Sequence, residues 1–334
     1  MDFLVYGAGA VGSVLGGALS LHHHAVHLVG RRAFVDAVQA DGLRIKSATG
    51  EYVTHPRVSE TIRSGEVGES ACVLLTVKAQ DVEAAVESLA ALVPSTVTVV
   101  CFQNGVASED LAARRFSRVL GGIVRMTCSM VQPGHAAYRS SGRVIVGLHP
   151  KGADPFARTL AVALGEAGFD GAVSRNITED KWLKLAVNTQ SVFHAVIDTR
   201  DHDANEFHEL KVAILEETRR VLKAARIRAR SCDGRDPSIE EMVTELRRPR
   251  ARRGEHGVKV HNSIWQDLYL HRDCIEAGFV HEPLISLGRT HGVPTPCNQA
   301  AMDIAKRCHD SGAGPESMRL ADVLAAVERL KGGQ

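Results

Sequence analysis

Short apolar runs alternate with amphipathic helical patterns through the first half of the chain. The runs are rich in Val, Leu and Ile, which is typical of buried strands, and helical periodicity such as that of 81–92 separates several of them. This alternation predicts a doubly wound α/β sheet, mostly parallel. The predicted strands are 2–7, 25–30, 43–47, 72–77, 96–102, 119–131 and 143–148.

After about residue 175 the strand-like runs stop, and apolar residues recur at helical spacing. The glycine-containing segment 167–180 separates the two patterns, and a chain of 334 residues exceeds the usual size of a single core. We therefore predict two domains, a sheet domain at 1–174 and an all-helical domain at 175–334. The predicted helices are 178–197, 206–226, 237–247, 258–274, 276–292 and 298–310.

Composition narrows the class of protein. The 40 basic and 39 acidic residues nearly cancel and aromatic residues make up 4%, so neither nucleic acid nor an anionic membrane is an expected partner. No apolar run approaches the ~18 residues of a membrane span. The seven scattered cysteines contain no CxxC pair, which argues against a zinc site and a disulfide framework. We expect a soluble, cytoplasmic protein without a bound metal.

Two segments rich in titratable residues allow two interpretations each. The run RRPRARRGEHG at 247–257 could grip phosphates, but a solvated loop is favoured because the net charge is only +1 and no aromatic residues interleave. For His22–His24, a solvated connector is favoured over a metal site, because adjacent residues of a regular helix cannot all face one ion.

The sequence GAGAVG at 7–12 follows the first predicted strand directly and opens a helical pattern. In this context Gly7 permits a tight turn, Gly9 lets backbone amides approach a pyrophosphate, and Gly12 allows helix and strand to pack closely. The pattern predicts a dinucleotide-binding turn, and a strand–helix turn without a ligand is the alternative. The residues predicted to bind the cofactor here are Gly7, Ala8, Gly9, Ala10, Val11 and Gly12.

The residues after the second predicted strand decide between NADH and NADPH. An acidic residue there would bond the ribose 2′-hydroxyl of NADH. The chain has Arg31 and Arg32 instead, with no carboxylate before Asp36. Because a guanidinium binds a 2′-phosphate and a carboxylate repels it, Arg31 predicts NADPH as the cofactor. For Arg32, a solvated surface charge is the alternative.

The order and spacing of several motifs resemble those of ketopantoate reductases over nearly the whole chain. Besides GAGAVG, the motifs are TVKAQD (76–81), FQNGV (102–106), KWLKLAVN (181–188), NSIWQDL (262–268) and RTHGVPTPCN (289–298). The resemblance implies a Rossmann domain followed by a helical domain of the 6-phosphogluconate-dehydrogenase-like type. It also implies NADPH-dependent reduction of a 2-oxo acid to a 2-hydroxy acid, as in the conversion of ketopantoate to pantoate in pantothenate biosynthesis.

The resemblance assigns two further residues to the cofactor, Lys78 of TVKAQD and Asn104 of FQNGV. Both motifs follow predicted strands, and ligands of open α/β sheets bind at the carboxyl ends of the strands. For Asn104, which is followed by Gly105, a simple turn is the alternative.

On the substrate side, the resemblance implies that Lys184 donates the proton, that Asn188, Asn262 and Ser263 contact the substrate, and that Glu276 is the acid of the active site. The chemistry agrees for Lys184. Reduction of a carbonyl builds negative charge on its oxygen, and a nearby ammonium stabilises that charge and supplies the proton. For Glu276, a surface glutamate is the alternative.

The helical wheel of 178–197 supports an active edge. Lys184, Asn188 and Ser191 lie on one border of its apolar stripe, whereas Lys181 is interpreted as a solvated charge. The stripe itself is predicted to consist of Trp182, Leu185, Ala186, Phe193 and Val196.

Departures from the family pattern leave the substrate open. Val192 stands where the family commonly has a second asparagine, the stretch 276–282 reads EAGFVHE, and 233–257 is longer and more basic. We interpret the substrate pocket as less polar, which alters specificity. The competing interpretations are an opine-type or other carbonyl or imine reductase and a non-catalytic NADPH-binding regulator. The oligomeric state is open, with a homodimer as one candidate.

Overall fold

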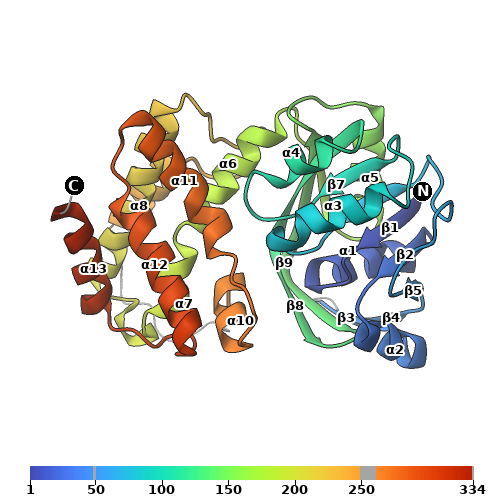
Figure 1. The fold of residues 1–334 in the computed structure, drawn as a ribbon, viewed down its shortest axis with the longest axis horizontal. Helices are drawn as coiled ribbons and strands as arrows, with labels where there is room; N and C mark the ends of the chain where they lie inside the picture. Colours follow the sequence, from blue (N-terminus) through green and yellow to red (C-terminus); the bar gives the residue numbers. More distant parts are fainter. Residues whose placement is uncertain (48–49, 249–260, 333–334) are drawn as a thin grey trace. The chain divides into compact units, whose positions relative to one another are not determined.

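The computed structural model describes residues 1–47, 50–248 and 261–332. By its internal contacts the chain divides into two compact units, Met1–Thr178 and Glu179–Gln334 (Figure 1). The boundary predicted from the sequence lies a few residues before this division. A doubly wound sheet domain and a helical domain are both confirmed. No helix in the described ranges is long and apolar enough to cross a membrane.

Unit one is built on a sheet of ten described strands. These are β1 (Asp2–Tyr6), β2 (Ala25–Val29), β3 (Leu43–Lys46), β4 (Glu51–Thr54), β5 (Arg57–Ser59), β6 (Cys72–Leu75), β7 (Thr98–Cys101), β8 (Arg118–Gln132), β9 (His135–Leu148) and β10 (Asp170–Val173). Their spatial order is β4-β3-β9-β8-β7-β6-β1-β2-β5, with β10 beside β9. β1 pairs in parallel with β2 on one side and β6 on the other, which makes β1 the switch point of the sheet.

The sheet is mostly parallel, as predicted, and two of its strand pairs are antiparallel, β3 with β4 and the long hairpin of β8 and β9. The sequence predicted only the end of β9, at 143–148, whereas the strand begins at His135 after the turn at Pro133 and Gly134. The first half of β9 reads HAAYRSSG and pairs with both β8 and β3. It contains no apolar run, so its periodicity does not indicate a strand.

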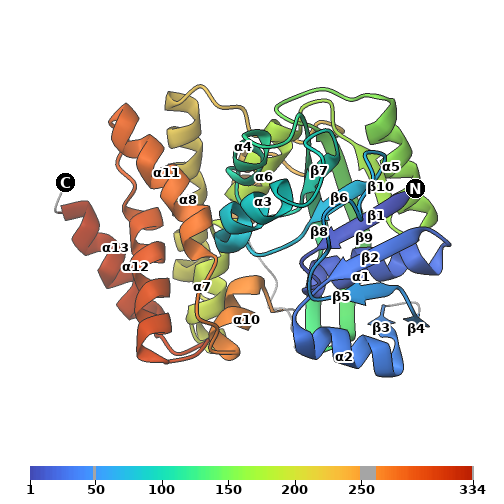
Figure 2. The same ribbon diagram turned by 45° about the vertical axis from the view of Figure 1, so that its right-hand side comes forward.

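Helices cover both faces of the sheet. They are α1 (Ala10–Leu21), α2 (Arg32–Asp41), α3 (Val82–Ala90), α4 (Ser108–Ala113) and α5 (Pro155–Glu166), with the short 3₁₀ helix η1 (Ala79–Asp81). Phe3 and Val5 of β1 belong to one apolar cluster and Leu4 to another, because successive strand residues point to opposite faces. The first cluster contains residues of α1, α2 and α5, and the second contains residues of α3 and α4, which can be followed in Figure 2.

Unit two is helical in its described part. Its elements are α6 (Ile177–Asn188), which begins at the boundary, α7 (Ser191–Val196), η2 (Thr199–Asp201), α8 (Asn205–Ala224), α9 (Ile239–Arg247), α10 (Ser263–Tyr269), α11 (Ala277–His291), α12 (Pro296–Ser311) and α13 (Leu320–Gly332). One apolar cluster joins α7, α8, α12 and α13 through residues such as Phe193, Ile214, Ala301 and Val323. In both views α12 lies between α11 and α13 (Figures 1 and 2).

A buried carboxylate caps α12 and joins it to α8 and α11. Glu217 of α8 is fully buried; its Oε2 accepts the amide N–H of Cys297 at 2.9 Å and its Oε1 accepts that of Asn298 at 2.8 Å. Nδ2 of Asn298 donates to the same Oε1 at 2.8 Å, and Oδ1 of Asn298 accepts from Nδ1 of His281, also 2.8 Å away. Amides at a helix N-terminus lack intrahelical acceptors, so Glu217 satisfies donors that burial would otherwise orphan.

Two segments far apart in the sequence pair beside the end of α7. The N–H of Glu316 donates to the carbonyl of Ala195 at 2.8 Å, and that of Met318 donates to Val196 at 2.9 Å. The N–H of Asp198 donates in turn to the carbonyl of Met318 at 2.9 Å. The chain just before α13 therefore fixes the end of α7.

Candidate active site

Four parallel strands of unit one end at the same level. Val29, Tyr6, Leu75 and Cys101, the last residues of β2, β1, β6 and β7, are aligned in this order by the strand register. The loops that follow leave the sheet at one carboxyl edge, where open α/β sheets bind ligands. The predicted cofactor residues on these loops are the turn 7–12, Arg31, Lys78 and Asn104.

The three glycines of the turn have different surroundings. Gly7 has φ +113°, and a Cβ there would lie 2.5 Å from the amide nitrogen of Val77. A Cβ on Gly12 would lie 2.3 Å from the carbonyl oxygen of Gly7 and 2.6 Å from Oγ1 of Thr76. A Cβ on the exposed Gly9 would have nothing within 4 Å. Gly7 and Gly12 therefore allow close packing, whereas Gly9 leaves open space before the first turn of α1.

The first turn of α1 suits the phosphates of a dinucleotide. The amides of Gly7 and Ala8 donate to the carbonyl of Val29 at 3.1 Å and 2.8 Å, so they are already bonded within the sheet domain. Those of Ala10 and Val11 have no backbone acceptor among the residues described, as expected at a helix N-terminus. No acidic residue lies in this turn. Free amides and the positive end of the helix dipole fit a pyrophosphate.

Arg31 and Arg32 differ in their partners. Nε of Arg32 lies 2.9 Å from Oδ1 of Asp36, and its NH1 lies 3.3 Å from Oε1 of Glu60. These bonds, first that to Asp36, raise the pKa of the Arg32 guanidinium. Arg31 is exposed at the N-cap of α2, and its side chain has no hydrogen bond or ion pair within the described ranges. Arg31 is therefore the guanidinium that is available to a ligand.

The FQNGV loop is tied to the end of β6 by a residue that the sequence reasoning did not single out. Gln103 is 4% exposed, and its Nε2 donates to the carbonyls of Leu75 at 2.9 Å and Val77 at 3.0 Å. Lys78, the N-cap of η1, and Asn104 are both partly exposed. Gln103 therefore joins the two loops that carry these side chains.

Helix α6 buries one face and leaves Lys184 and Asn188 partly exposed on its edge. Lys181 is not a solvated charge: it is 4% exposed, beside Asp180 at 1%. The prediction for Lys181 was wrong because the buried face of α6 extends further round the helix than its apolar residues indicate. The predicted stripe is buried at all its positions, Trp182, Leu185, Ala186, Phe193 and Val196.

The NSIWQDL motif supplies the N-terminus of α10. Oδ1 of Asn262 accepts the N–H of Trp265 at 2.9 Å, and its Nδ2 donates to the carbonyl of Ser191 at 2.9 Å. The Asn262 side chain thus joins α10 to α7, close in sequence to Asn188. Ser263, the first residue of α10, is partly exposed. The start of this motif therefore lies beside Ser191, three residues after the last residue of α6, and the Asn262 side chain is already bonded within the protein.

Glu276 is not a surface glutamate. It is 6% exposed and stands at the N-cap position of α11, without a side-chain capping bond. A carboxylate is costly to bury unless it is paired or hydrogen-bonded, and the positive end of the helix dipole reduces that cost. The burial of Glu276 fits the prediction that it is an acid inside the protein. Glu276 lies at the start of α11, whereas Lys184 lies on another helix, α6.

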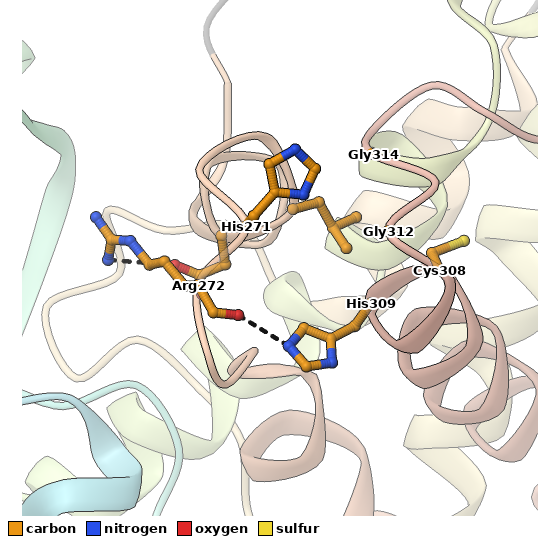
Figure 3. A pocket seen from close by; sticks show the side chains of 8 residues that line it. His271, Arg272, Cys308, His309, Gly312 and Gly314 are labelled. Carbon is orange, nitrogen blue, oxygen red and sulfur yellow. Dashed lines mark hydrogen bonds and ion pairs between the residues drawn. The ribbon is translucent and has the colours of Figure 1, made fainter.

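Two of the cavities in the described part of unit two differ strongly in size. Figure 3 shows the smaller, of about 60 Å³, where NH1 of Arg272 lies 3.3 Å from Oδ1 of Asp267 and Nε2 of His309 lies 2.8 Å from the carbonyl oxygen of Arg272. A space of this size accommodates water rather than a substrate. The larger, of about 550 Å³, lies beside α7 and falls within the ~300–1,000 Å³ of small-molecule sites.

The lining of the larger cavity includes Ser191 of the predicted active edge and three residues of the motifs, Val187, Asn262 and Trp265. The sequence reasoning missed its other walls, among them His202 and Glu316, because they come from segments that only folding brings together. Val192 was expected to make the pocket less polar. It is instead fully buried in the helical core and is not part of the cavity lining.

The remaining predictions concern metals and the basic segment. In the described ranges, no group of three or more His, Cys, Asp or Glu side chains could hold a metal ion. Arg247 pairs with Glu216 at 2.9 Å and Arg248 with Glu245 at 2.6 Å, and the rest of the basic segment, 249–257, lies outside the described residues.

A glycine turn at the switch point of a doubly wound sheet is typical of proteins that bind a dinucleotide. The model of the family described as ketopantoate reductase PanE/ApbA matches residues 3–151, and the model of its C-terminal domain matches 176–309. The chain therefore belongs to the ketopantoate reductase family. Like its relatives named 2-dehydropantoate 2-reductase, it is an oxidoreductase acting on a CH–OH group.

Individual relatives span almost the whole chain. The 2-dehydropantoate 2-reductase of Pyrococcus horikoshii is 24% identical over 315 residues, which cover 94% of this chain and 99% of the relative. The crystal structure of that enzyme from Methylococcus capsulatus is 26% identical, with a TM-score of 0.75 and coverage of 94% and 98%. A D-mandelate dehydrogenase structure with NADH and anilino(oxo)acetate shares the fold at 22% identity, with a TM-score of 0.78 and coverage of 93% and 99%.

Proposed function

We propose that the protein reduces a 2-oxo acid to a 2-hydroxy acid with NADPH, and that ketopantoate belongs to the substrates to be tested. The observation that carries this proposal is the edge of α6. Lys184 and Asn188 are partly exposed one turn apart on a helix whose other face is buried, in a chain of the ketopantoate reductase family. An ammonium and an amide at this spacing can act on one small substrate.

The loops at the carboxyl edge of the sheet would hold the cofactor. The amides of Ala10 and Val11 would donate to its pyrophosphate, and Arg31 would bind its 2′-phosphate in a charge-assisted contact. Lys78 and Asn104 would contact its ribose or carboxamide. When bound, the dihydronicotinamide supplies the hydride that reduces the substrate carbonyl.

Residues of unit two would supply the rest of the chemistry. The Lys184 ammonium stabilises the negative charge that develops on the carbonyl oxygen and donates a proton to that oxygen. Asn188 and Ser263 donate hydrogen bonds that orient the substrate. The buried Glu276 carboxylate accepts a hydrogen bond from a substrate hydroxyl. Asn262 acts mainly by holding α10 against α7, since both ends of its amide are bonded within the protein.

Steady-state oxidation of NADPH and NADH with a panel of 2-oxo acids tests this proposal. The panel contains ketopantoate, pyruvate, phenylpyruvate and 2-oxoglutarate, and pyruvate is also offered with an amine to detect an opine-type product. We expect at least one 2-oxo acid to be reduced to its 2-hydroxy acid, with a preference for NADPH. If the parent protein oxidises neither cofactor with any of these acids, the proposed function is wrong.

A further inference from the structure

The lysine helix α6 reaches the cavity of about 550 Å³ near its end. Val187 follows Lys184 by three residues, so it lies one turn further along α6, and it lines the cavity. After a two-residue turn, Ser191 and His194 of α7 line the cavity too. Lys184 therefore lies one helical turn before a residue of the cavity wall.

Flat rings form much of the cavity wall. The rings of His261 and Trp265 are stacked with their centroids 3.5 Å apart. His202 stacks on Phe207 at 4.5 Å, and His194 packs edge-on against His202 at 5.4 Å. Such rings interact favourably with a further aromatic ring, either in offset stacking or edge-on. The cavity is therefore suited to a planar group.

Polar groups on α7 are available to a ligand. Within the described ranges, no hydrogen bond engages the side chains of Gln190, Ser191 or His194, which all line the cavity. Burial lowers the pKa of His194 to about 3. The imidazole is therefore neutral at neutral pH and has one donor and one acceptor. A neutral, polar aromatic ligand matches this surface better than a charged one.

Glu316 determines the sign of the charge in the cavity. Its Oε1 accepts the Nε1–H of Trp265 at 3.1 Å, and its φ of +56° is a conformation that residues other than glycine rarely adopt. Of the described residues that line the cavity, Glu316 alone has a carboxylate, and none is Lys or Arg. A second carboxylate on the substrate would be repelled, whereas a ring hydroxyl or N–H could donate to Glu316.

We propose that this cavity binds the side chain of an aromatic 2-oxo acid, such as an arylpyruvate, whose 2-oxo acid group lies at Lys184. The inference rests on the proposed function and names its substrate class. The ring packs between the flat walls, and a donor on the ring bonds Glu316. The branched aliphatic side chain of ketopantoate cannot stack on these walls, and 2-oxoglutarate brings its second carboxylate towards Glu316.

The test compares kcat/KM for phenylpyruvate, 4-hydroxyphenylpyruvate, ketopantoate, pyruvate and 2-oxoglutarate in the parent and three variants. We expect kcat/KM for the two arylpyruvates to exceed that for ketopantoate at least tenfold.

The variants test the cavity. Gln190→Phe narrows it and should lower kcat/KM for phenylpyruvate at least tenfold while changing that for pyruvate less than threefold. Gln299→Phe, the same change on α12 away from the cavity, should alter neither. Glu316→Gln keeps an acceptor for Trp265 and should raise kcat/KM for 2-oxoglutarate about tenfold.

A parent enzyme that reduces ketopantoate better than both arylpyruvates overturns the inference and leaves the proposed function standing. Equal losses for phenylpyruvate and pyruvate in Gln190→Phe overturn it too. If no 2-oxo acid is reduced at all, the proposed function fails, and calorimetric titration with phenylpyruvate then decides about the cavity. If the parent binds phenylpyruvate and Gln190→Phe weakens this binding at least tenfold, the inference about the cavity is supported. If the parent does not bind phenylpyruvate, or the variant binds it equally well, the inference is refuted.

Discussion

Nε of Arg32 lies 2.9 Å from Oδ1 of Asp36, and this ion pair distinguishes two arginines that are neighbours in the sequence. Because Arg32 is already bonded to carboxylates, Arg31 is the one that can bind a 2′-phosphate. Arg31→Ala should weaken NADPH binding about 10- to 100-fold, in line with the loss of a charged hydrogen bond, and leave NADH binding almost unchanged. Titration of the parent and the variant with both cofactors measures this.

Arg32→Ala is the matched control, and it should change the preference for NADPH much less than Arg31→Ala does. Equal dissociation constants for NADPH and NADH in the parent protein would show that neither arginine selects the cofactor.

Gly9 and Gly12 should respond differently to alanine. A Cβ on Gly12 would meet the carbonyl oxygen of Gly7 at 2.3 Å, so Gly12→Ala should lower the melting temperature. A Cβ on Gly9 meets no protein atom within 4 Å but enters the space proposed for the cofactor. Gly9→Ala should therefore keep the parent melting temperature and weaken cofactor binding. Thermal denaturation and cofactor titration of both variants test this, and tight cofactor binding by Gly9→Ala would contradict it.

Lys184→Ala should lower kcat by ~10²–10⁴-fold, the range for a positioned general acid. Cofactor affinity should stay close to that of the parent, since the proposed cofactor residues all belong to unit one. The measurement is steady-state oxidation of the preferred cofactor with the best 2-oxo acid. A kcat within a few-fold of the parent value would exclude Lys184 as the proton donor.

The control for Lys184 cannot be Lys181, because Lys181 is 4% exposed. Removing a buried charge leaves its surroundings uncompensated, so Lys181→Ala should lower the melting temperature as well as the activity. Lys223→Ala, an exposed lysine in the last turn of α8, is the suitable control and should change neither quantity.

Glu217→Gln should destabilise the protein by about 1–3 kcal/mol, because an amide cannot accept all of the N–H bonds that the carboxylate accepts and leaves a buried donor unsatisfied. Urea denaturation measures the change. Glu216→Gln is the neighbouring control; its partner Arg247 is exposed, so it should shift the unfolding free energy by less than about 1 kcal/mol. Equal effects of the two variants would show that the cap on α12 is not needed for stability.

His281 should make stability depend on pH. Burial lowers its pKa from 6.5 to about 4 in the folded protein. Between these values the unfolded chain binds the proton more readily, so stability is highest above pH 6.5 and falls as the pH drops towards 4. The loss from this residue should reach up to about 3 kcal/mol.

Urea denaturation of the parent and of His281→Leu at several pH values isolates this contribution, because other buried histidines such as His194 act in the same direction in both proteins. The variant should lose less stability on acidification than the parent. Parallel pH curves would contradict the assignment.

The predicted architecture could be read from the sequence where burial follows a simple period. The strand β6 is apolar along its length, and β1 and β7 are apolar after their first residue. All three were predicted, and so was the order of helices from α8 to α12. The last helix, α13, was missed although Leu320, Val323 and Val327 recur at helical spacing. The pattern of α13 was therefore present in the sequence and was overlooked.

Other features depend on contacts between distant segments and leave no local trace. The first half of β9 is a strand because β3 and β8 pair with it, and Lys181 is buried although a charged residue at this position predicts exposure. The cavity beside α7 needs Trp265 and Glu316, which follow His194 by long stretches of chain and meet through one hydrogen bond. Motif order could indicate Lys184 and Asn188 as candidates, whereas the walls of the cavity beside α7 could be seen only in the folded structure.

The strand-like pairing of 316–318 with the end of α7 bears on how this enzyme could diversify. The family model of the C-terminal domain ends at residue 309, so Glu316 and Met318 lie beyond the matched region. One wall of the cavity is thus encoded apart from the helix that carries Lys184. If the cavity binds the substrate as proposed, mutations at 316–318 can change which substrates are accepted without altering Lys184.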